Sequence, residues 1–166
     1  MSSKRLKSTV KWLIPPLLAV AGLAWLHWQP LAPGVRLRLT TIDGNVIQVP
    51  GPQLTLLNFW ATTCPACLKE IPTLIRLHRR FSGVQLQVVG VTMPYDRPDR
   101  VVRLARDYPL PYPVALDPAG TAADSLGVRF TPTWVLVDRE GKVVWRHTGY
   151  VDEAELAALI ESLSHP

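Results

Sequence analysis

Short hydrophobic segments of strand length alternate with segments of helical periodicity along most of the chain. Residues 35–41 alternate between apolar and polar side chains, which is typical of a half-buried strand, and Asp43-Gly44 marks a turn after them. Nearly continuous apolar runs follow and favour strands that are buried on both faces. The expected strands are residues 35–41, 46–49, 54–60, 84–92, 114–116, 133–138 and 143–148.

Four helices are expected between or after these strands, at residues 65 to about 80, 98–107, 121–126 and 152–163. In the first, apolar side chains recur at helical spacing and Gly83 follows as a stop signal. In the last, Asp152 is the expected N-cap, and acidic residues occupy the first turn. The order predicts an α/β fold with a mixed central β-sheet, helices on its faces and a β-hairpin at its start.

An uncharged segment precedes the first strand. Residues 12–28 are almost entirely apolar and would span about 25 Å as a helix, and residues 29–31 extend this toward the thickness of a bilayer core. The four basic residues before it predict a cytoplasmic N-terminus. We therefore expect a cytoplasmic tail at 1–11, a single-pass transmembrane anchor at 12–31 and a domain at 32–166 on the oxidising side, such as a bacterial periplasm.

Two other interpretations of this segment remain open. A cleaved signal peptide would have a shorter apolar region and small residues at its end, whereas bulky residues lie at 25–28. A buried core helix is disfavoured by Pro15 and Pro16.

The charge of the chain is concentrated in this tail. The sequence pI is about 9.6, yet residues 1–11 hold four basic residues and no acid, while the remainder carries 14 basic and 13 acidic residues. A nucleic-acid-binding domain needs clustered Lys and Arg on its folded surface, so we expect no nucleic-acid partner.

The chain has only two cysteines, Cys64 and Cys67, and they lie where a strand ends and a helix begins. A thiolate is favoured at a helix N-terminus by the helix dipole and by free backbone N–H groups. We expect Cys64 to attack a partner disulfide and Cys67, one turn further on, to resolve the mixed disulfide. Pro65 suits the first helical turn. Half of a zinc site or a static disulfide would also contain two such cysteines.

The residues around the cysteines are more specific. The stretch 58–72, NFWATTCPACLKEIP, together with the later Thr131-Pro132, resembles the TlpA/ResA/DsbE (CcmG) group of membrane-anchored thioredoxin-fold thiol–disulfide oxidoreductases. The resemblance covers about residues 35–163, and residues 92–113 resemble the central insertion of that group. It implies a thioredoxin-like fold.

The resemblance also implies roles for residues outside the CxxC motif. Thr131 and Pro132 match the cis-proline loop that binds substrate, and Trp60 and Pro65 are expected beside it. Glu70 matches an acidic residue near the active site and is expected to act in proton transfer to or from Cys67. The alternatives are an ordinary trans proline and a solvated helix carboxylate.

By the same resemblance we expect a protein-disulfide reductase that acts on cysteine-containing substrates such as apocytochrome c or metal-site proteins. It would receive electrons from a membrane donor of the DsbD/CcdA type. No glycine-rich nucleotide fingerprint is found, so no nicotinamide or flavin cofactor is expected. No metal is expected either, because a metal site needs two more ligands, while no second CxxC exists and His78 and His147 are far apart in the sequence. Two alternatives are a copper- or zinc-binding metallochaperone and a thiol peroxidase, although Ala61 stands where the peroxidase has a threonine.

Overall fold

The structure is a computed structural model of the chain, and it describes residues 34–83 and 85–164. The predicted tail and membrane anchor lie outside these residues. Within them, no helix is both long enough and apolar enough to cross a membrane.

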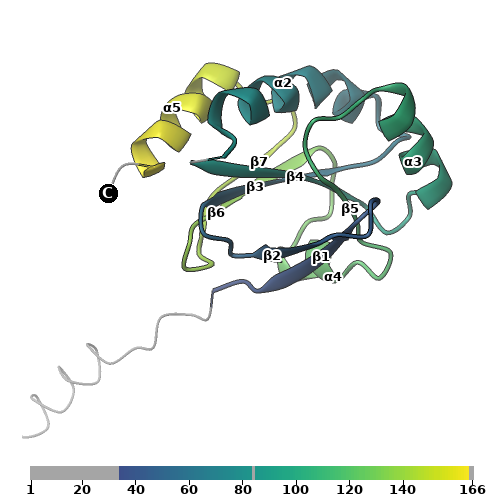
Figure 1. Ribbon diagram of the computed structural model, residues 1–166, viewed down its shortest axis with the longest axis horizontal. Helices are drawn as coiled ribbons and strands as arrows, with labels where there is room; N and C mark the ends of the chain where they lie inside the picture. Colours follow the sequence, from purple (N-terminus) through teal and green to yellow (C-terminus); the bar gives the residue numbers. More distant parts are fainter. Residues whose placement is uncertain (1–33, 84, 165–166) are drawn as a thin grey trace, which may run out of the picture. The chain divides into compact units, whose positions relative to one another are not determined.

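A seven-stranded sheet forms the centre of the fold, with the strand order β2-β1-β5-β4-β3-β6-β7 (Figure 1). β3 pairs in parallel with β4 and antiparallel with β6, so the sheet is mixed, as the sequence predicted. The elements are β1 Leu37–Thr41, β2 Val46–Val49, β3 Leu54–Trp60, α2 Pro65–Phe81, β4 Leu86–Thr92, α3 Pro98–Asp107, β5 Val114–Leu116, α4 Thr121–Ser125, β6 Thr133–Val137, β7 Val143–Thr148 and α5 Glu153–Ser164.

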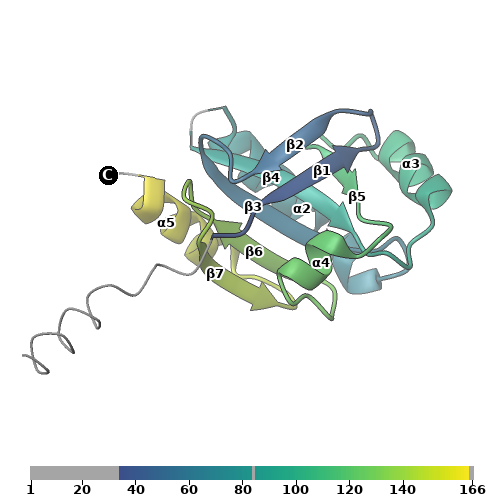
Figure 2. The same ribbon diagram turned by 90° about the horizontal axis from the view of Figure 1, so that it is seen from below.

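Two hydrophobic layers enclose the sheet. Helices α2, α3 and α5 cover one face, and α4 lies on the other (Figures 1 and 2). Alternate residues of β3 point to opposite faces, so Leu56 packs in the layer beneath α2 and α5 while Leu57 packs in the layer with α4. Because β3 is buried at every position, its sequence is apolar almost throughout.

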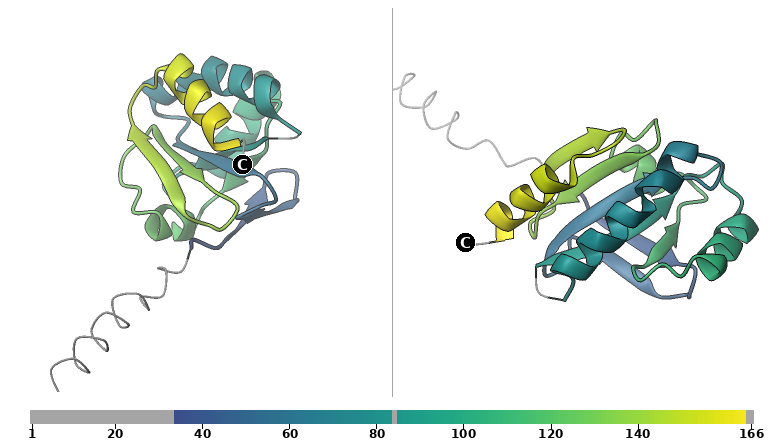
Figure 3. Two further views of the ribbon diagram at one scale, coloured as in Figure 1. Left: turned by 90° about the vertical axis from the view of Figure 1, so that its left-hand side faces the viewer. Right: turned by 90° about the horizontal axis from the view of Figure 1, so that it is seen from above.

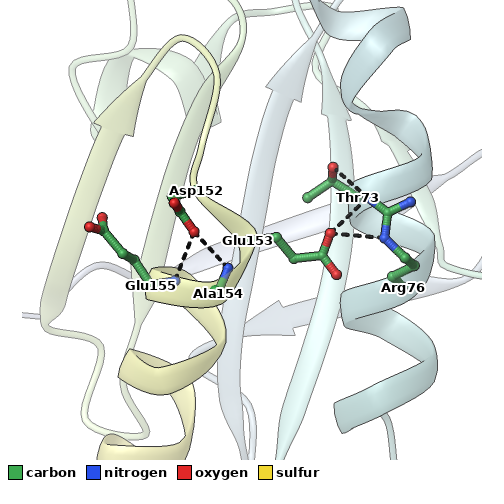
Figure 4. Close-up of polar contacts among 6 residues, drawn as sticks. All are labelled: Thr73, Arg76, Asp152, Glu153, Ala154 and Glu155. Atoms are coloured by element: carbon green, nitrogen blue, oxygen red, sulfur yellow. Dashed lines mark hydrogen bonds and ion pairs between the residues drawn. The ribbon is translucent and has the colours of Figure 1, made fainter.

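Helix α5 lies beside α2 on the same face of the sheet (Figure 3). The Asp152 carboxylate accepts hydrogen bonds from the N–H groups of Ala154, at 2.8 Å, and Glu155, at 3.1 Å, which confirms the predicted cap (Figure 4). Next to this cap, Glu153 forms an ion pair of 2.7 Å with Arg76 of α2. The start of α5 is thereby linked to the helix that carries the cysteines.

The described chain begins at a tight backbone contact with the β6–β7 turn. The Val35 N–H donates a 2.7 Å hydrogen bond to the carbonyl of Gly141. A Cβ atom on Gly34 would lie 2.5 Å from the Glu140 carbonyl oxygen, and Gly141 has a positive φ of 89°. This contact explains why the first strand starts at Leu37 instead of residue 35, since Val35 bonds to the turn instead of to a strand neighbour.

Candidate active site

The two cysteines form a disulfide at the N-terminus of α2, with their Cα atoms 5.3 Å apart. Cys64 is the N-cap residue, and its Sγ accepts a 3.1 Å hydrogen bond from the Cys67 N–H. Cys64 is half-buried, whereas Cys67 is only 2% exposed. The structure thus places the two sulfurs as the sequence predicted, one accessible and one beneath it, and Pro65 lies exposed between them at the helix start.

The loop before β6 contains the predicted proline. The Thr131–Pro132 peptide is cis, as the resemblance implied, and the trans alternative was wrong. Pro132 is buried, and its carbonyl accepts a 2.8 Å hydrogen bond from the Gly149 N–H. The Gly149 carbonyl in turn accepts a 3.1 Å bond from the Trp134 indole. These contacts hold the Thr131–Pro132 loop to the segment between β7 and α5.

Glu70 lies one helical turn after Cys67 and is buried, with 5% of its surface exposed. It is therefore not the solvated helix carboxylate that the sequence left open. Burial raises the pKa of Glu70, and a backbone hydrogen bond from Val151 opposes that rise. Its Oε2 has no hydrogen-bond partner among the described residues. A carboxyl group whose proton is held more tightly than usual is suited to exchanging that proton with a nearby thiol.

Trp60 does not lie where a substrate would contact it. Its side chain is 4% exposed and packs in the core, so the expected substrate contact is corrected to a packing role. The indole fits against Gly90 of the neighbouring strand, where a Cβ atom would lie 3.0 Å from its Nε1 and 3.3 Å from Cε2 of Tyr112. Trp60 therefore supports the active-site loop from below.

Sequence reasoning missed an acidic residue that contacts the active-site loop. The Asp96 carboxylate accepts hydrogen bonds from the backbone N–H and the hydroxyl of Thr62, each 2.6 Å long. Asp96 is 9% exposed and lies between β4 and α3. The two residues are 34 positions apart, and no sequence motif joins them, so only the fold brings them together.

Exposed aromatic side chains that neighbour these loop residues in the sequence were also missed. Phe130 is 73% exposed and immediately precedes Thr131, and Tyr150 is 55% exposed and immediately follows Gly149. Tyr95, next to Asp96, is 62% exposed. The sequence does show an aromatic residue beside each loop, but it does not show that these side chains are exposed, because exposure cannot be inferred from residue type alone.

Comparison with known proteins defines the family of this site. A profile described as Redoxin matches residues 32–160. The chain belongs to the Redoxin family. This Redoxin-family chain is 30% identical over 106 residues to the thiol-disulfide oxidoreductase ResA of Halalkalibacterium halodurans, a match that covers 63% of this chain and 59% of the relative. It is also 30% identical over 127 residues to the thioredoxin-like protein YneN of Bacillus subtilis, covering 75% of this chain and 74% of that protein.

A solved structure supports the same assignment. The crystal structure of StoA from Bacillus subtilis superposes with a TM-score of 0.68 at 25% identity, covering 78% of this chain and 98% of StoA. The predicted resemblance to the ResA/DsbE type and the thioredoxin-like fold are thereby confirmed, and the Redoxin-family chain is a thiol–disulfide oxidoreductase.

A metal site would need further ligands gathered around the two cysteines. Across residues 34–83 and 85–164, no three His, Cys, Asp or Glu side chains gather in an arrangement that could hold a metal ion.

Proposed function

We propose that this protein reduces disulfides in cysteine-containing proteins on the outer side of a bacterial inner membrane, to which residues 12–31 anchor it. The observation that carries the proposal is the Cys64–Cys67 disulfide, whose half-buried sulfur caps α2 in a chain of the ResA type. The uncharged N-terminal segment and its basic flank support the anchor and the orientation.

The reaction begins from the dithiol form of the pair. The Cys64 thiolate attacks one sulfur of a substrate disulfide, a mixed disulfide forms, and the other substrate sulfur leaves as a thiolate that takes up a proton. Cys67 then loses its proton and attacks the Cys64 sulfur, which releases the second substrate thiol. Two electrons pass to the substrate, and the Cys64–Cys67 disulfide of the present structure is the product.

Glu70 is the proposed proton acceptor in the second step. Cys67 is buried and has little access to solvent bases, and the nearest carboxyl along the helix is one turn away. Because burial raises the pKa of Glu70, this carboxylate accepts a proton more readily than an exposed glutamate does.

The substrate is proposed to be an extended polypeptide segment around a cysteine, of the kind found in an apocytochrome c or an immature metal-site protein. Thr131 is partly exposed beside Pro132. Two exposed aromatic residues adjoin this loop: Phe130 precedes Thr131, and Tyr150 follows Gly149, whose N–H bonds the Pro132 carbonyl. A membrane dithiol donor of the DsbD/CcdA type would return two electrons to the pair.

Trapping in cells tests this function. The full-length chain carrying Cys67→Ser should accumulate as mixed disulfides with substrate proteins, because the resolving sulfur is absent, and reducing agent should release them. The matched control, with both Cys64→Ser and Cys67→Ser, should trap none. Purified wild type that fails to reduce any protein disulfide, together with no adducts in cells, would overturn the proposal.

The location has a separate test. A reporter fused after Pro166 should be active only on the non-cytoplasmic side, and the mature protein should retain its first 30 residues. A processed N-terminus near Ala32 would contradict the anchor.

A further inference from the structure

A β-turn sets the position of the attacking cysteine. The Cys64 N–H donates a 3.1 Å hydrogen bond to the Ala61 carbonyl, so Thr62 and Thr63 are the two central residues of the turn that leads into α2. Thr63 is exposed, and its side chain forms no hydrogen bond with the residues that the structure describes. Thr62 therefore carries the contacts that decide how the turn lies on the protein.

Both polar groups that Thr62 can donate go to one carboxylate. Its N–H reaches Oδ2 of Asp96 and its hydroxyl reaches Oδ1, each at 2.6 Å. Hydrogen bonds to an ionised acceptor are shorter and stronger than those between neutral groups. Because the two bonds leave different atoms of Thr62, they fix the orientation of the turn as well as its distance from the β4–α3 segment.

The acceptor is itself held firmly. Asp96 Oδ1 accepts a further 3.0 Å hydrogen bond from the Arg97 N–H, and the Asp96 N–H donates to the Met93 carbonyl at 3.0 Å. The Met93 N–H donates at 3.0 Å to the carbonyl of Trp60, at the end of β3. The segment from Met93 to Asp96 is thus bonded on both sides of Ala61. Arg97 directs its guanidinium to Asp99 instead of Asp96.

We propose that Asp96 is a positioning residue of the redox site, which holds the Thr62 turn and through it sets the exposure and reactivity of the Cys64 sulfur. This inference rests on the proposed function, since it concerns the sulfur that attacks the substrate. Asp96 acts through Thr62 and takes no part in bond making.

Isosteric variants of both partners test the pair. In Asp96→Asn one carboxylate oxygen becomes an NH₂ group, which cannot accept a hydrogen bond. At the Oδ2 position it loses the bond from the Thr62 N–H, and at the Oδ1 position it loses the bond from the Arg97 N–H and can only donate to the Thr62 hydroxyl, so the turn should loosen in either orientation. In the reduced full-length protein, alkylation of Cys64 at neutral pH should change by at least about fivefold and the midpoint of its pH profile should move, because small displacements at a reacting atom have large effects on rate. Thr62→Val, which keeps the N–H bond, should show a smaller change in the same direction.

Two controls separate positioning from general stability. Asp99→Asn removes an exposed carboxylate in the first turn of α3, which bonds Arg97 and the adjoining backbone, and it should leave Cys64 alkylation within twofold of wild type. Combining Asp96→Asn with Thr62→Val should have less effect than the product of the single changes, because both remove the same contact.

Several outcomes would overturn the inference. One is an Asp96→Asn protein that melts at a lower temperature but has the wild-type Cys64 pH profile, which would mean a structural role only. Another is a double variant whose change in the Cys64 alkylation rate equals the product of the changes in the two single variants. Alkylation needs no substrate, so these results stand whether or not the wild type reduces protein disulfides, and a failure of the proposed function remains distinguishable.

Discussion

At the scale of single residues, Cys64 is both the cap of a helix and the predicted nucleophile. Its sulfur accepts the Cys67 N–H, so the same atom that stabilises the start of α2 is the atom that must reach a substrate. Cys67 has a 2% exposed side chain and cannot be reached without movement of its surroundings. The order of attack and resolution therefore follows from burial.

This difference gives a direct prediction. In the reduced protein, a small alkylating reagent should modify Cys64 at least about tenfold faster than Cys67 at neutral pH, because Cys64 is accessible and lies at the positive end of the helix dipole. Peptide mass mapping after short exposure measures both sites in one sample. Equal labelling, or faster labelling of Cys67, would contradict the assigned roles.

A second residue-scale prediction concerns Gly90. Gly90→Ala should destabilise the protein by about 1–3 kcal/mol, because the new methyl group would press on the Trp60 indole and the Tyr112 ring, both of them buried. Urea unfolding measures the loss. Gln48→Ala, at an exposed strand position, is the control and should change stability by less than about 0.5 kcal/mol. A Gly90→Ala variant with the same stability as the wild type would show that the layer under the active-site loop can relax.

At the scale of secondary-structure elements, α5 is held on α2 by two kinds of contact. Ion pairs join Arg76 to Glu153 (Figure 4) and Arg80 to Glu161, at 2.7 and 2.6 Å, but all four side chains are at least 37% exposed. Beneath them, Leu156 and Ile160 are buried in the core. Exposed ion pairs contribute little to the free energy of unfolding because water and salt screen them. Truncating a buried apolar side chain costs more, because the protein loses both the hydrophobic burial and the packing of the removed atoms.

We therefore expect Ile160→Ala to cost about 2–5 kcal/mol of unfolding free energy. Glu161→Gln, one residue further along the same helix, should cost no more than about 1 kcal/mol, and that cost should shrink at high salt. Denaturant titrations at two salt concentrations check both values. A large, salt-sensitive loss in Glu161→Gln would mean that the surface ion pairs hold the helix.

The sequence was a good guide at the level of elements. Helix α3 and strands β2, β3, β5 and β7 have the predicted bounds, because their hydrophobic periods and the prolines or glycines that flank them are strong local signals. The order of strands in the sheet and the Asp96–Thr62 contact were not predictable from those signals. Both depend on which distant segments meet, and periodicity carries no such information. The sequence also left open whether Glu70 is solvated, as most helix carboxylates are, and only the fold shows that it is buried.

At the scale of the whole molecule, the buried Glu70 carboxyl and the half-buried His78 imidazole make stability depend on pH in opposite directions. Burial raises the pKa of Glu70 above its ordinary 4.5. Burial, and then the charge of Arg79, lowers the pKa of His78 below its ordinary 6.5. The folded protein thus favours the neutral form of each group. The contribution of Glu70 is present below pH 4.5 and is lost as pH rises through its folded pKa, and that of His78 is present above pH 6.5 and is lost as pH falls through its folded pKa.

Unfolding of the oxidised protein as a function of pH tests this. Relative to wild type, Glu70→Gln should gain stability progressively as pH rises above 4.5, because the wild type alone must then bury a charge. His78→Gln should gain stability relative to wild type as pH falls below 6.5. The two difference curves should have opposite slopes. Parallel curves, or flat ones, would show that these groups titrate alike in the folded and unfolded chains.

The contact between Gly34 and the β6–β7 turn has a mechanical consequence. β6 begins next to Pro132, where Thr133 pairs with Phe59 near the end of β3 that leads to Cys64, and it ends at Val137, next to the turn that holds Val35. The polypeptide therefore enters the domain about 15 Å or more from the reactive end, at roughly 3.3 Å per strand residue. A force applied to the chain at Gly34 would therefore act first on the β6–β7 turn, at the other end of β6 from the strand ends that lead to Cys64.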